Sequence, residues 1–249
     1  MPYPFYACEM VFNYLLYSIT TILEVSMLNQ LSQEEKYYII GLFQGDASHS
    51  ENTRNRGKVQ LEISLKDADL VHKLESILSK IVKVYVSSRE RSVIFKTGQQ
   101  YLHTSIILSI YDWEFRKAIK PYVPAGCKCN IINAPKDMPD NMFRHYLRGL
   151  YDADGSLGMT SKNIPYISMC AKSEEIKQFI CDYMQAYLGI EKKLNRNKRD
   201  DIYNIILTKE SAQQYSEILY RDSTIYLDRK YKKYLEVQSW ERPSSMRKK

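Results

Sequence analysis

Two segments of the chain alternate between polar and apolar residues in the same phase. In Lys58–Lys66 the even-numbered positions are polar and the odd-numbered ones apolar, and Tyr166–Lys172 follows the same pattern. Such alternation is typical of a β-strand with one solvent-exposed face. Each segment precedes a stretch with apolar residues at helical spacing, at Leu70–Leu78 and Ile176–Met184, offset by 106 residues (176 − 70). The chain therefore contains two copies of a strand–helix unit.

Each copy is preceded by an apolar segment that is predicted to be a helix ending in an aspartate. Residues 39–48 contain Asp46 and residues 147–156 contain Asp154, an offset of 108 residues (154 − 46). In both, small residues recur four positions apart, at Gly41, Gly45, Gly149 and Ala153. Small residues on one helix face let two helices approach closely. We therefore expect the two helices to pack together and their terminal aspartates to meet.

Two carboxylates in this position need an explanation. The C-terminal end of a helix carries a partial negative charge, which disfavours an acid there, and two adjacent carboxylates repel each other. A divalent cation held between Asp46 and Asp154 would relieve both effects. The alternative is that each pair of small residues is ordinary tight packing and each aspartate a turn residue. The duplication favours the paired-acid site.

Three helix starts are predicted from capping residues. Ser32 with Glu35 forms a capping box before the first motif helix, and Asp137 with Pro139 is expected to start the second. Ser173 is expected to cap the later helix of the second copy.

The predicted fold is α+β, with two pseudo-symmetric αββαββα subdomains. The early strands are expected at 48–53 and 156–161, and a hairpin in the second copy at 191–199 and 201–207. In the first copy three segments compete for the two later strand positions, namely 82–87, 92–96 and 101–109. Further helices are expected at 110–120, 208–220 and 228–238.

The same pattern divides the chain into five parts. These are an apolar-rich N-terminal extension (1–30), a first subdomain (31–120), a proline-containing linker (121–138), a second subdomain (139–238) and a polar, basic tail expected to be disordered (239–249). The extension lacks the basic start of a signal peptide and the uninterrupted length of a membrane span.

The two motifs, IIGLFQGDAS and LRGLYDADGS, resemble the LAGLIDADG motif of homing endonucleases. The second is close to the family pattern, whereas the first has Gln44 in place of the first acid and Ala47 in place of the final glycine. The resemblance covers roughly residues 31–238 and is to the monomeric, two-motif members. It implies two antiparallel sheets that form a DNA-binding saddle.

The resemblance also implies a metal site and its ligands. Asp46 and Asp154 would bind Mg²⁺, together with the backbone carbonyl groups of Gly45 and Ala153. Mn²⁺ is expected to substitute, and Ca²⁺ to bind without supporting cleavage. Such a cation lowers the pKa of a bound water and neutralises phosphate charge.

Lys66 and Lys172 end the polar faces of equivalent strands. By resemblance, basic residues in such positions lie beside the cleavage centre and stabilise transition-state charge. The alternative is a solvated strand end or a phosphate clamp.

The polar strand faces supply the candidate DNA contacts, because a two-stranded ribbon fits the major groove. In the first copy the candidates are Arg54, Arg56, Lys58, Gln60, Glu62, Ser64, Arg89, Arg91 and Lys96; in the second they are Lys162, Tyr166, Ser168, Arg196, Asn197, Lys198 and Arg199. The copies differ at nearly every such position, so we expect an asymmetric target.

Composition agrees with a nucleic-acid partner without requiring one. Lysine and arginine number 36 against 29 acidic residues, a formal net charge of +7, which favours a polyanion. Five scattered cysteines do not form a disulfide framework, so an intracellular reducing compartment, cytoplasm or organelle matrix, is expected. We expect a monomer with no membrane partner.

The sequence therefore predicts a site-specific, Mg²⁺-dependent double-strand DNA endonuclease that leaves 3′ overhangs by resemblance to the family. The chain lacks the terminal residues of a splicing intein, so an intron-encoded or free-standing enzyme is expected. The alternative is a non-cleaving nucleic-acid binder, such as a group I intron RNA maturase. Ala47 keeps that alternative open, because glycine tolerates positive φ and alanine does not.

Overall fold

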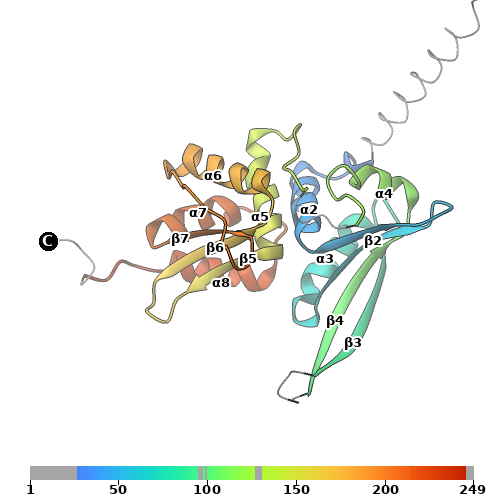
Figure 1. Cartoon of the computed structure of the whole chain (residues 1–249), viewed down its shortest axis with the longest axis horizontal. Helices are drawn as coiled ribbons and strands as arrows, with labels where there is room; N and C mark the ends of the chain where they lie inside the picture. The colour runs from blue at the N-terminus through green and yellow to red at the C-terminus, as the bar shows by residue number, and fades with distance from the viewer. Residues whose placement is uncertain (1–26, 95–97, 99, 127–130, 245–249) are drawn as a thin grey trace, which may run out of the picture.

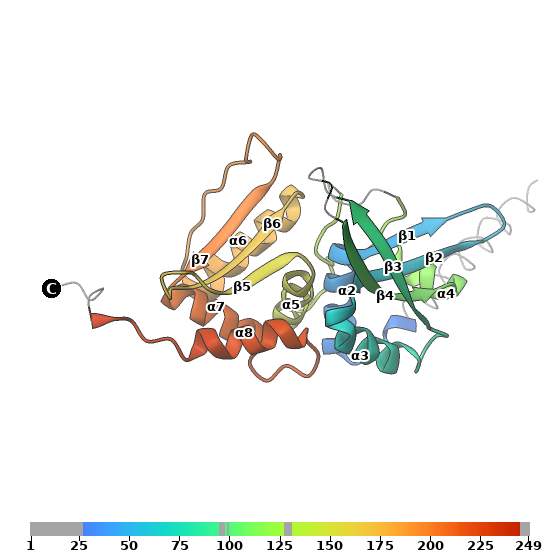
Figure 2. The same cartoon turned by 90° about the horizontal axis from the view of Figure 1, so that it is seen from below.

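The computed structural model describes residues 27–94, 98, 100–126 and 131–244. It contains two antiparallel sheets, each flanked by helices, and the helices α2 (Gln33–Asp46) and α5 (Phe143–Asp154) lie side by side between them (Figure 1, Figure 2). This is the predicted α+β architecture in two pseudo-symmetric halves. Most of the N-terminal extension, Lys96 and the last five residues fall outside the described part of the chain.

Two of the three predicted helix starts are confirmed. The hydroxyl oxygen of Ser32 accepts the N–H of Glu35, whose carboxylate accepts the N–H of Ser32. The hydroxyl of Ser173 likewise accepts the N–H of Ile176. The prediction for Asp137 is wrong, because a 3₁₀ turn (Asp140–Met142) capped by extended Pro139 precedes α5.

The first sheet has the strand order β1-β2-β4-β3. Its strands are β1 (Ala47–Glu51), β2 (Gly57–Ser64), β3 (Tyr85–Ile94) and β4 (Gln100–Ile110), and the helices of this half beside α2 are α3 (Ala68–Leu78) and α4 (Trp113–Ile119). Of the three competing segments, the first two contribute to the single strand β3 and the third is β4. The partner of β4 along its inner edge is β2, with Leu61 opposite Leu108 in the buried layer.

The alternating strand of the first copy is shorter than predicted. β2 ends at Ser64, and Leu65–Asp67 form a 3₁₀ turn (η1), so Lys66 does not lie on the strand. The physical reason is that Leu65, the last apolar position of the pattern, is exposed and has no core to face.

The second sheet has three strands in the order β5-β6-β7. They are β5 (Gly155–Met159), β6 (Pro165–Ala171) and β7 (Tyr203–Thr208), and the helices are α6 (Glu174–Leu188), α7 (Glu210–Tyr220) and α8 (Asp228–Gln238).

The predicted strand at 191–199 is wrong. This segment makes only an isolated bridge between Asn197 and Ile202. Side chains attach it to β7 instead: Arg196 donates to the hydroxyl of Tyr203 and Lys192 to the carbonyl of Ile206. These contacts replace a backbone ladder.

The predicted disorder of residues 239–249 is wrong for the part that the structure describes. Trp240 is buried and its indole N–H donates to the carbonyl of Asn163, and Arg242 pairs with Glu210.

The glycines of α2 and α5 set the spacing of these two helices. A Cβ on Gly41 would overlap the carbonyl oxygen of Tyr146 and lie 3.0 Å from the nitrogen of Leu150. A Cβ on Gly149 would overlap the carbonyl oxygen of Tyr38 in the same way. The two contacts are related by the 108-residue offset of the motifs. The predicted close packing of the motif helices is therefore confirmed.

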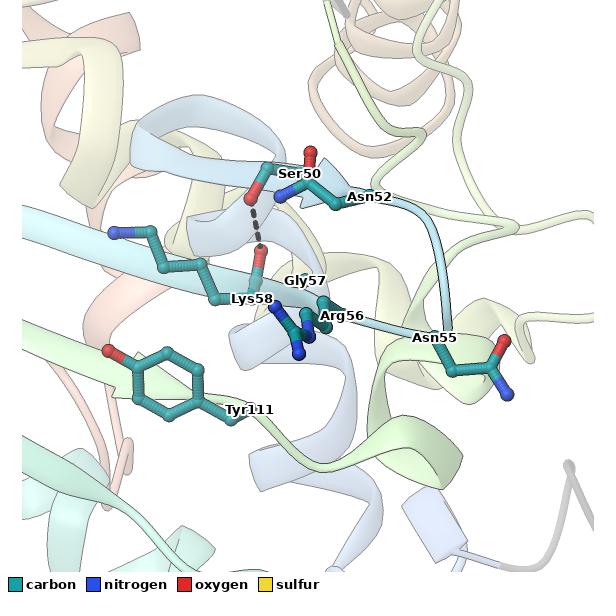
Figure 3. Close-up of a pocket in the computed structure, with 7 residues that line it drawn as sticks. All are labelled: Ser50, Asn52, Asn55, Arg56, Gly57, Lys58 and Tyr111. Carbon is teal, nitrogen blue, oxygen red and sulfur yellow. Dashed lines mark hydrogen bonds between the residues drawn. The ribbon is translucent and has the colours of Figure 1, made fainter.

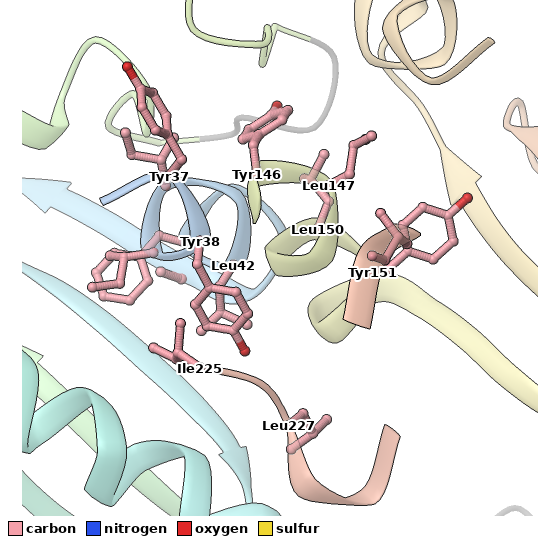
Figure 4. Close-up of a cluster of buried hydrophobic side chains, with 14 of the residues drawn as sticks. Tyr37, Tyr38, Leu42, Tyr146, Leu147, Leu150, Tyr151, Ile225 and Leu227 are labelled. Carbon is pink, nitrogen blue, oxygen red and sulfur yellow. The ribbon is translucent and has the colours of Figure 1, made fainter. Parts of the chain in front are cut away.

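Large apolar side chains surround this contact (Figure 4). Tyr38, Leu42, Tyr146 and Leu150 are all buried, and Leu227 from the segment before α8 closes the cluster. The helix pair thus forms the centre of one core that joins both halves.

A buried ion pair also joins the halves. The guanidinium of Arg148 donates to Glu34 at 2.5 Å and to the carbonyl of Ile225 at 2.9 Å. Burial alone would raise the pKa of Glu34, but hydrogen bonds from His145 and the N–H of Thr224 and the charge of Arg148 lower it to about 2. Its contribution to stability is therefore complete above about pH 4.5 and is lost as the pH falls towards 2.

We predict that Gly149→Ala destabilises the protein by about 1–3 kcal/mol. Alanine would normally favour a helix over glycine by up to about 1 kcal/mol, but here its methyl group would push the backbones of α2 and α5 apart. Urea unfolding of both proteins measures the difference. The control is Gly158→Ala, where a Cβ would meet only Lys233 and Tyr166 at 3.7 Å or more. Equal stability of Gly149→Ala and the unmodified chain would contradict the helix contact.

Candidate active site at the paired helix ends

Asp46 and Asp154 are the last residues of α2 and α5, and both are exposed. Each helix passes directly into a strand. Ala47 and Gly155, the next residues, have φ of −81° and −82°. Both values are negative, so alanine fits at position 47 without backbone strain, and the first motif can close as the second does.

The two helix ends meet. A Cβ on Gly45 would overlap the Cβ of Ala153 and lie 3.3 Å from the Oδ2 atom of Asp154. The carboxylate of Asp154 therefore stands beside the last turn of α2, and only a residue without a side chain fits at position 45.

A cavity of about 240 Å³ opens at this junction. Both halves of the molecule line it. Its lining residues are Asp46, Glu62, Ile63, Ser64, Asp67 and Leu70 from the first half, and Asp152, Ala153, Leu227 and Arg229 from the second.

Gln44 and Asp152, the first polar positions of the two motifs, have equivalent structural roles. The hydroxyl of Tyr146 donates to Gln44 at 2.5 Å, and the hydroxyl of Tyr38 donates to Asp152 at 2.8 Å. Asp152 is buried, and it also accepts hydrogen bonds from the hydroxyl of Tyr220 and the N–H of Leu227. Burial raises its pKa, and these contacts oppose that effect. Because the position serves as a hydrogen-bond acceptor for the partner helix, Gln44 is an adequate replacement for the acid.

Lys230 is a buried cation beside the helix ends that the sequence analysis missed. Its ammonium group donates to the carbonyl oxygens of Tyr151 and, at 2.8 Å, of Asp152, at the C-terminal end of α5. The residue is 4% exposed. Burial lowers its pKa, whereas Asp152, Asp46 and Asp154 act to raise it, so this cation lies within the field of the acid pair.

A signal for Lys230 exists in the sequence. Lys230, Tyr234 and Val237 recur at helical spacing and form the buried face of α8. A lysine on an apolar helix face must find a polar partner inside the protein.

The comparisons with known proteins agree with this geometry. A family profile described as a LAGLIDADG-like domain matches residues 142–220. The structure is similar to that of the homing endonuclease I-WcaI bound to its DNA recognition sequence, with a TM-score of 0.51 and 14% identity, over 85% of this chain and 90% of that one. The chain has the LAGLIDADG homing endonuclease fold.

Two further solved structures have weaker similarity to the chain. I-SmaMI bound to cleaved DNA matches with a TM-score of 0.48 and 13% identity, over 82% of this chain and 87% of that one. Full-length DUF199/WhiA from Thermatoga maritima matches with a TM-score of 0.48 and 13% identity, over 91% of this chain and 68% of that one. A comparison with curated proteins gave no match.

The two lysines proposed to lie beside the LAGLIDADG acids are exposed, and neither lines the cavity. Lys66 belongs to the turn η1, and Lys172 follows β6, where its carbonyl accepts from Arg196. Their catalytic roles stay predictions.

On the first sheet, Lys58, Gln60, Glu62 and Ser64 alternate along β2, and Arg89 and Arg91 of β3 contact Glu62. Arg56 and Lys58 line an outer cavity of about 490 Å³ beside Tyr111 (Figure 3). The rest of its lining is Ser50, Asn52, Asn55 and Gly57. Arg54 lies in the adjoining turn at φ 60°.

Three of the first-half candidates already have partners. Arg89 and Arg91 each contact the carboxylate of Glu62 at 3.4 Å, and Ser105 donates to it at 2.7 Å. Gln60 is 9% exposed and Ser64 lines the cavity at the helix ends. Each arginine uses one terminal nitrogen for Glu62, so its other N–H groups can still reach a phosphate.

Some DNA-contact candidates of the second half are exposed, and others already have partners within the protein. Lys162, Lys198 and Arg199 are exposed, and Ser168 is half-buried. Tyr166 contacts the hydroxyl of Ser156, Arg196 is held by Tyr203 and Asp201, and Asn197 and Arg199 contact Asp200. Arg196 therefore stabilises the 191–199 segment as well as adding charge.

The donor set at the helix ends fits a hard divalent cation. Within the described ranges no group of three or more histidine, cysteine or acidic side chains is placed to hold a metal. A cation there would use the carboxylates of Asp46 and Asp154, the carbonyls of Gly45 and Ala153, water and phosphate oxygens. Mg²⁺ usually binds in this way, retaining waters and using one or two carboxylates.

In the described part of the chain, no helix combines the length and apolar character needed to cross a membrane.

We predict that Lys230→Met destabilises the protein by about 3–5 kcal/mol, because it leaves buried Asp152 and two helix carbonyls without their cation. Urea unfolding at neutral pH measures this loss. Lys233→Met is the matched control on the same helix, since Lys233 makes an exposed pair with Glu236, and it should change stability by less than about 0.5 kcal/mol. Similar stabilities of the two variants would contradict the role given to Lys230.

Proposed function

We propose that the chain is a monomeric, site-specific DNA endonuclease that cuts both strands of a long, asymmetric target and leaves 3′ overhangs. The observation that supports this most strongly is the meeting of two exposed, carboxylate-bearing helix ends at a cavity lined by both halves. Two acids in that position are unfavourable for stability alone. Their placement is understandable if they bind cations that act on a phosphodiester.

Different residues of the chain would then bind the metal and offset the charge of the helix ends. Asp46, Asp154 and the carbonyls of Gly45 and Ala153 would hold Mg²⁺, which supplies a water of lowered pKa and neutralises charge on the phosphate. Lys230 reduces the negative potential at the end of α5 without leaving the protein interior. The packed helix ends would place the two carboxylates before the DNA arrives, which is the condition for electrostatic stabilisation of a transition state.

Basic side chains on the first sheet and in the turns beside both sheets would position the duplex. Arg54, Arg56 and Lys58 in the first half, and Lys162, Lys198 and Arg199 in the second, are placed for phosphate or base contacts. Phosphate contacts fix the register, whereas base contacts in the major groove specify the sequence. Because the two halves differ at these positions, the target should lack symmetry.

One observation favours a second candidate, an RNA-binding role such as that of a group I intron maturase. Tyr111 is 52% exposed beside Arg56 and Lys58, and Tyr85 packs edge-on against it at 5.3 Å. Exposed aromatic rings near cationic side chains stack on unpaired bases. Tighter binding of structured intron RNA than of selected DNA would support this role.

We predict that Asp46→Asn and Asp154→Asn each abolish double-strand cleavage, a loss of at least about 10²-fold, while DNA affinity stays within a few-fold. The substrate is a duplex selected for cleavage from a random library in Mg²⁺, and affinity is measured in Ca²⁺. The control Asp182→Asn changes an exposed acid on α6 and should cleave normally. An unmodified chain that binds a defined duplex but never nicks it in Mg²⁺ or Mn²⁺ would rule out the nuclease.

A further inference from the structure

Two neighbouring cations at the start of α8 have different environments. Lys230 is 4% exposed and donates to the carbonyls at the end of α5. The side chain of Arg229 is 50% exposed and lines the cavity that Asp46 also lines. Lys230 therefore cannot touch DNA without unfolding its surroundings, whereas Arg229 can.

Arg229 is oriented by a residue from the other half of the molecule. Its Nε and Nη2 atoms donate to the two carboxylate oxygens of Asp67, at 3.0 and 3.2 Å. Asp67 lies in the turn η1, and its side chain is 9% exposed. Such a two-point contact fixes the plane of a guanidinium group. It occupies one edge of the guanidinium and leaves Nη1, for which the described residues provide no hydrogen-bond acceptor.

The first turn of α8 is held in place beside this contact. Lys73 pairs with Asp228 and also donates to the carbonyl of Tyr226, and Asp69 accepts the N–H of Asp228 at 3.3 Å. These contacts join α3 to α8. The position of Arg229 relative to Asp46 therefore depends on both halves.

The side chains that line the cavity are mostly acidic, so a phosphodiester bound there would need a cation within reach. Among the described lining residues, Asp46, Glu62, Asp67 and Asp152 are acidic and Arg229 alone carries a cationic side chain. A phosphodiester would meet a largely negative wall here. Metal ions offset part of that charge, and an arginine adds directional donors to the phosphate oxygens that gain charge in the transition state.

We propose that Arg229 binds a non-bridging oxygen of the scissile phosphate through Nη1, and that Asp67 is its positioning residue. This inference rests on the proposed nuclease function. Arg229 stays protonated throughout and forms no covalent bond. The competing explanation is that the Arg229–Asp67 pair only fastens the two halves together.

The test compares Arg229→Ala, Arg229→Lys and Asp67→Asn in the full chain. Single-turnover cleavage of the selected duplex is measured at saturating protein in Mg²⁺, with affinity in Ca²⁺ and melting temperature alongside. Arg229→Ala should slow cleavage by about 10²-fold with affinity within about threefold, as expected for one lost transition-state donor. Arg229→Lys should recover only part of the rate. An ammonium group is a point charge and cannot bind Asp67 through one side of a planar group while Nη1 donates to the phosphate.

Chemical rescue separates the two explanations. Guanidinium ion at millimolar concentration should restore part of the rate of Arg229→Ala, and it should not help Asp67→Asn, which keeps its arginine. Arg221→Ala, at the exposed end of α7, is the control and should cleave normally.

Two results would overturn the inference alone. One is wild-type cleavage by Arg229→Ala. The other is equal loss of rate in Arg229→Ala and Asp67→Asn, in step with lower melting temperatures and without rescue, which would leave only a fastening role. Failure of the unmodified chain to cut any selected duplex would instead overturn the proposed function, and this inference with it.

Discussion

At Gly41 and Gly149 the backbones of α2 and α5 touch, because a Cβ at either position would overlap a carbonyl oxygen of the other helix. This contact fixes the distance between the two halves and brings the ends of both helices to one place. The meeting of Asp46 and Asp154 and the cavity that both halves line follow from that spacing. A side chain larger than hydrogen at either glycine would push the two helices apart, and the two aspartates with them.

The helix pair is attached to its surroundings in two related ways. In the first half the amide of Gln44 donates to the carbonyls of Tyr122 and Asn133, which belong to the connection after α4. In the second half Asp152 accepts from Tyr220, the last residue of α7, and from Leu227, at the end of the connection that follows. One motif therefore uses a neutral amide and the other a buried acid for the same task. The buried acid brings Lys230 with it, so the two halves of the site are electrostatically unequal.

The local features of this fold could be predicted from the sequence. The capping box at Ser32, the alternation in β2 and β6 and the small residues of the motifs each depend on contacts within one element or between two repeated ones. The early end of β2 and the absence of a strand at 191–199 could not be predicted. They depend on which neighbouring segments pack against the side chains or pair with the backbone.

Some residues of the candidate site could likewise be predicted from the sequence, and others could not. The motif spacing identified Asp46 and Asp154, because both stand at helix ends. The positions of Lys230 and Arg229 beside the acids could not be predicted, because they meet the acids only when α8 folds back across the molecule from more than 70 residues along the chain. Asp67, in the turn η1, meets Arg229 only in that arrangement. The sequence around these residues does not indicate that they contact the acids. The one exception is Lys230, a lysine on an apolar helix face.

Crystals of the chain with a selected target duplex and Mn²⁺ would test the central claim most directly, since anomalous scattering locates the metal. The account predicts a cation between the two helix ends, about 2–2.6 Å from a carboxylate oxygen of Asp46 or Asp154 and from a phosphate oxygen. Metal found only elsewhere on the DNA or protein, or helix ends that face away from the DNA backbone, would contradict it.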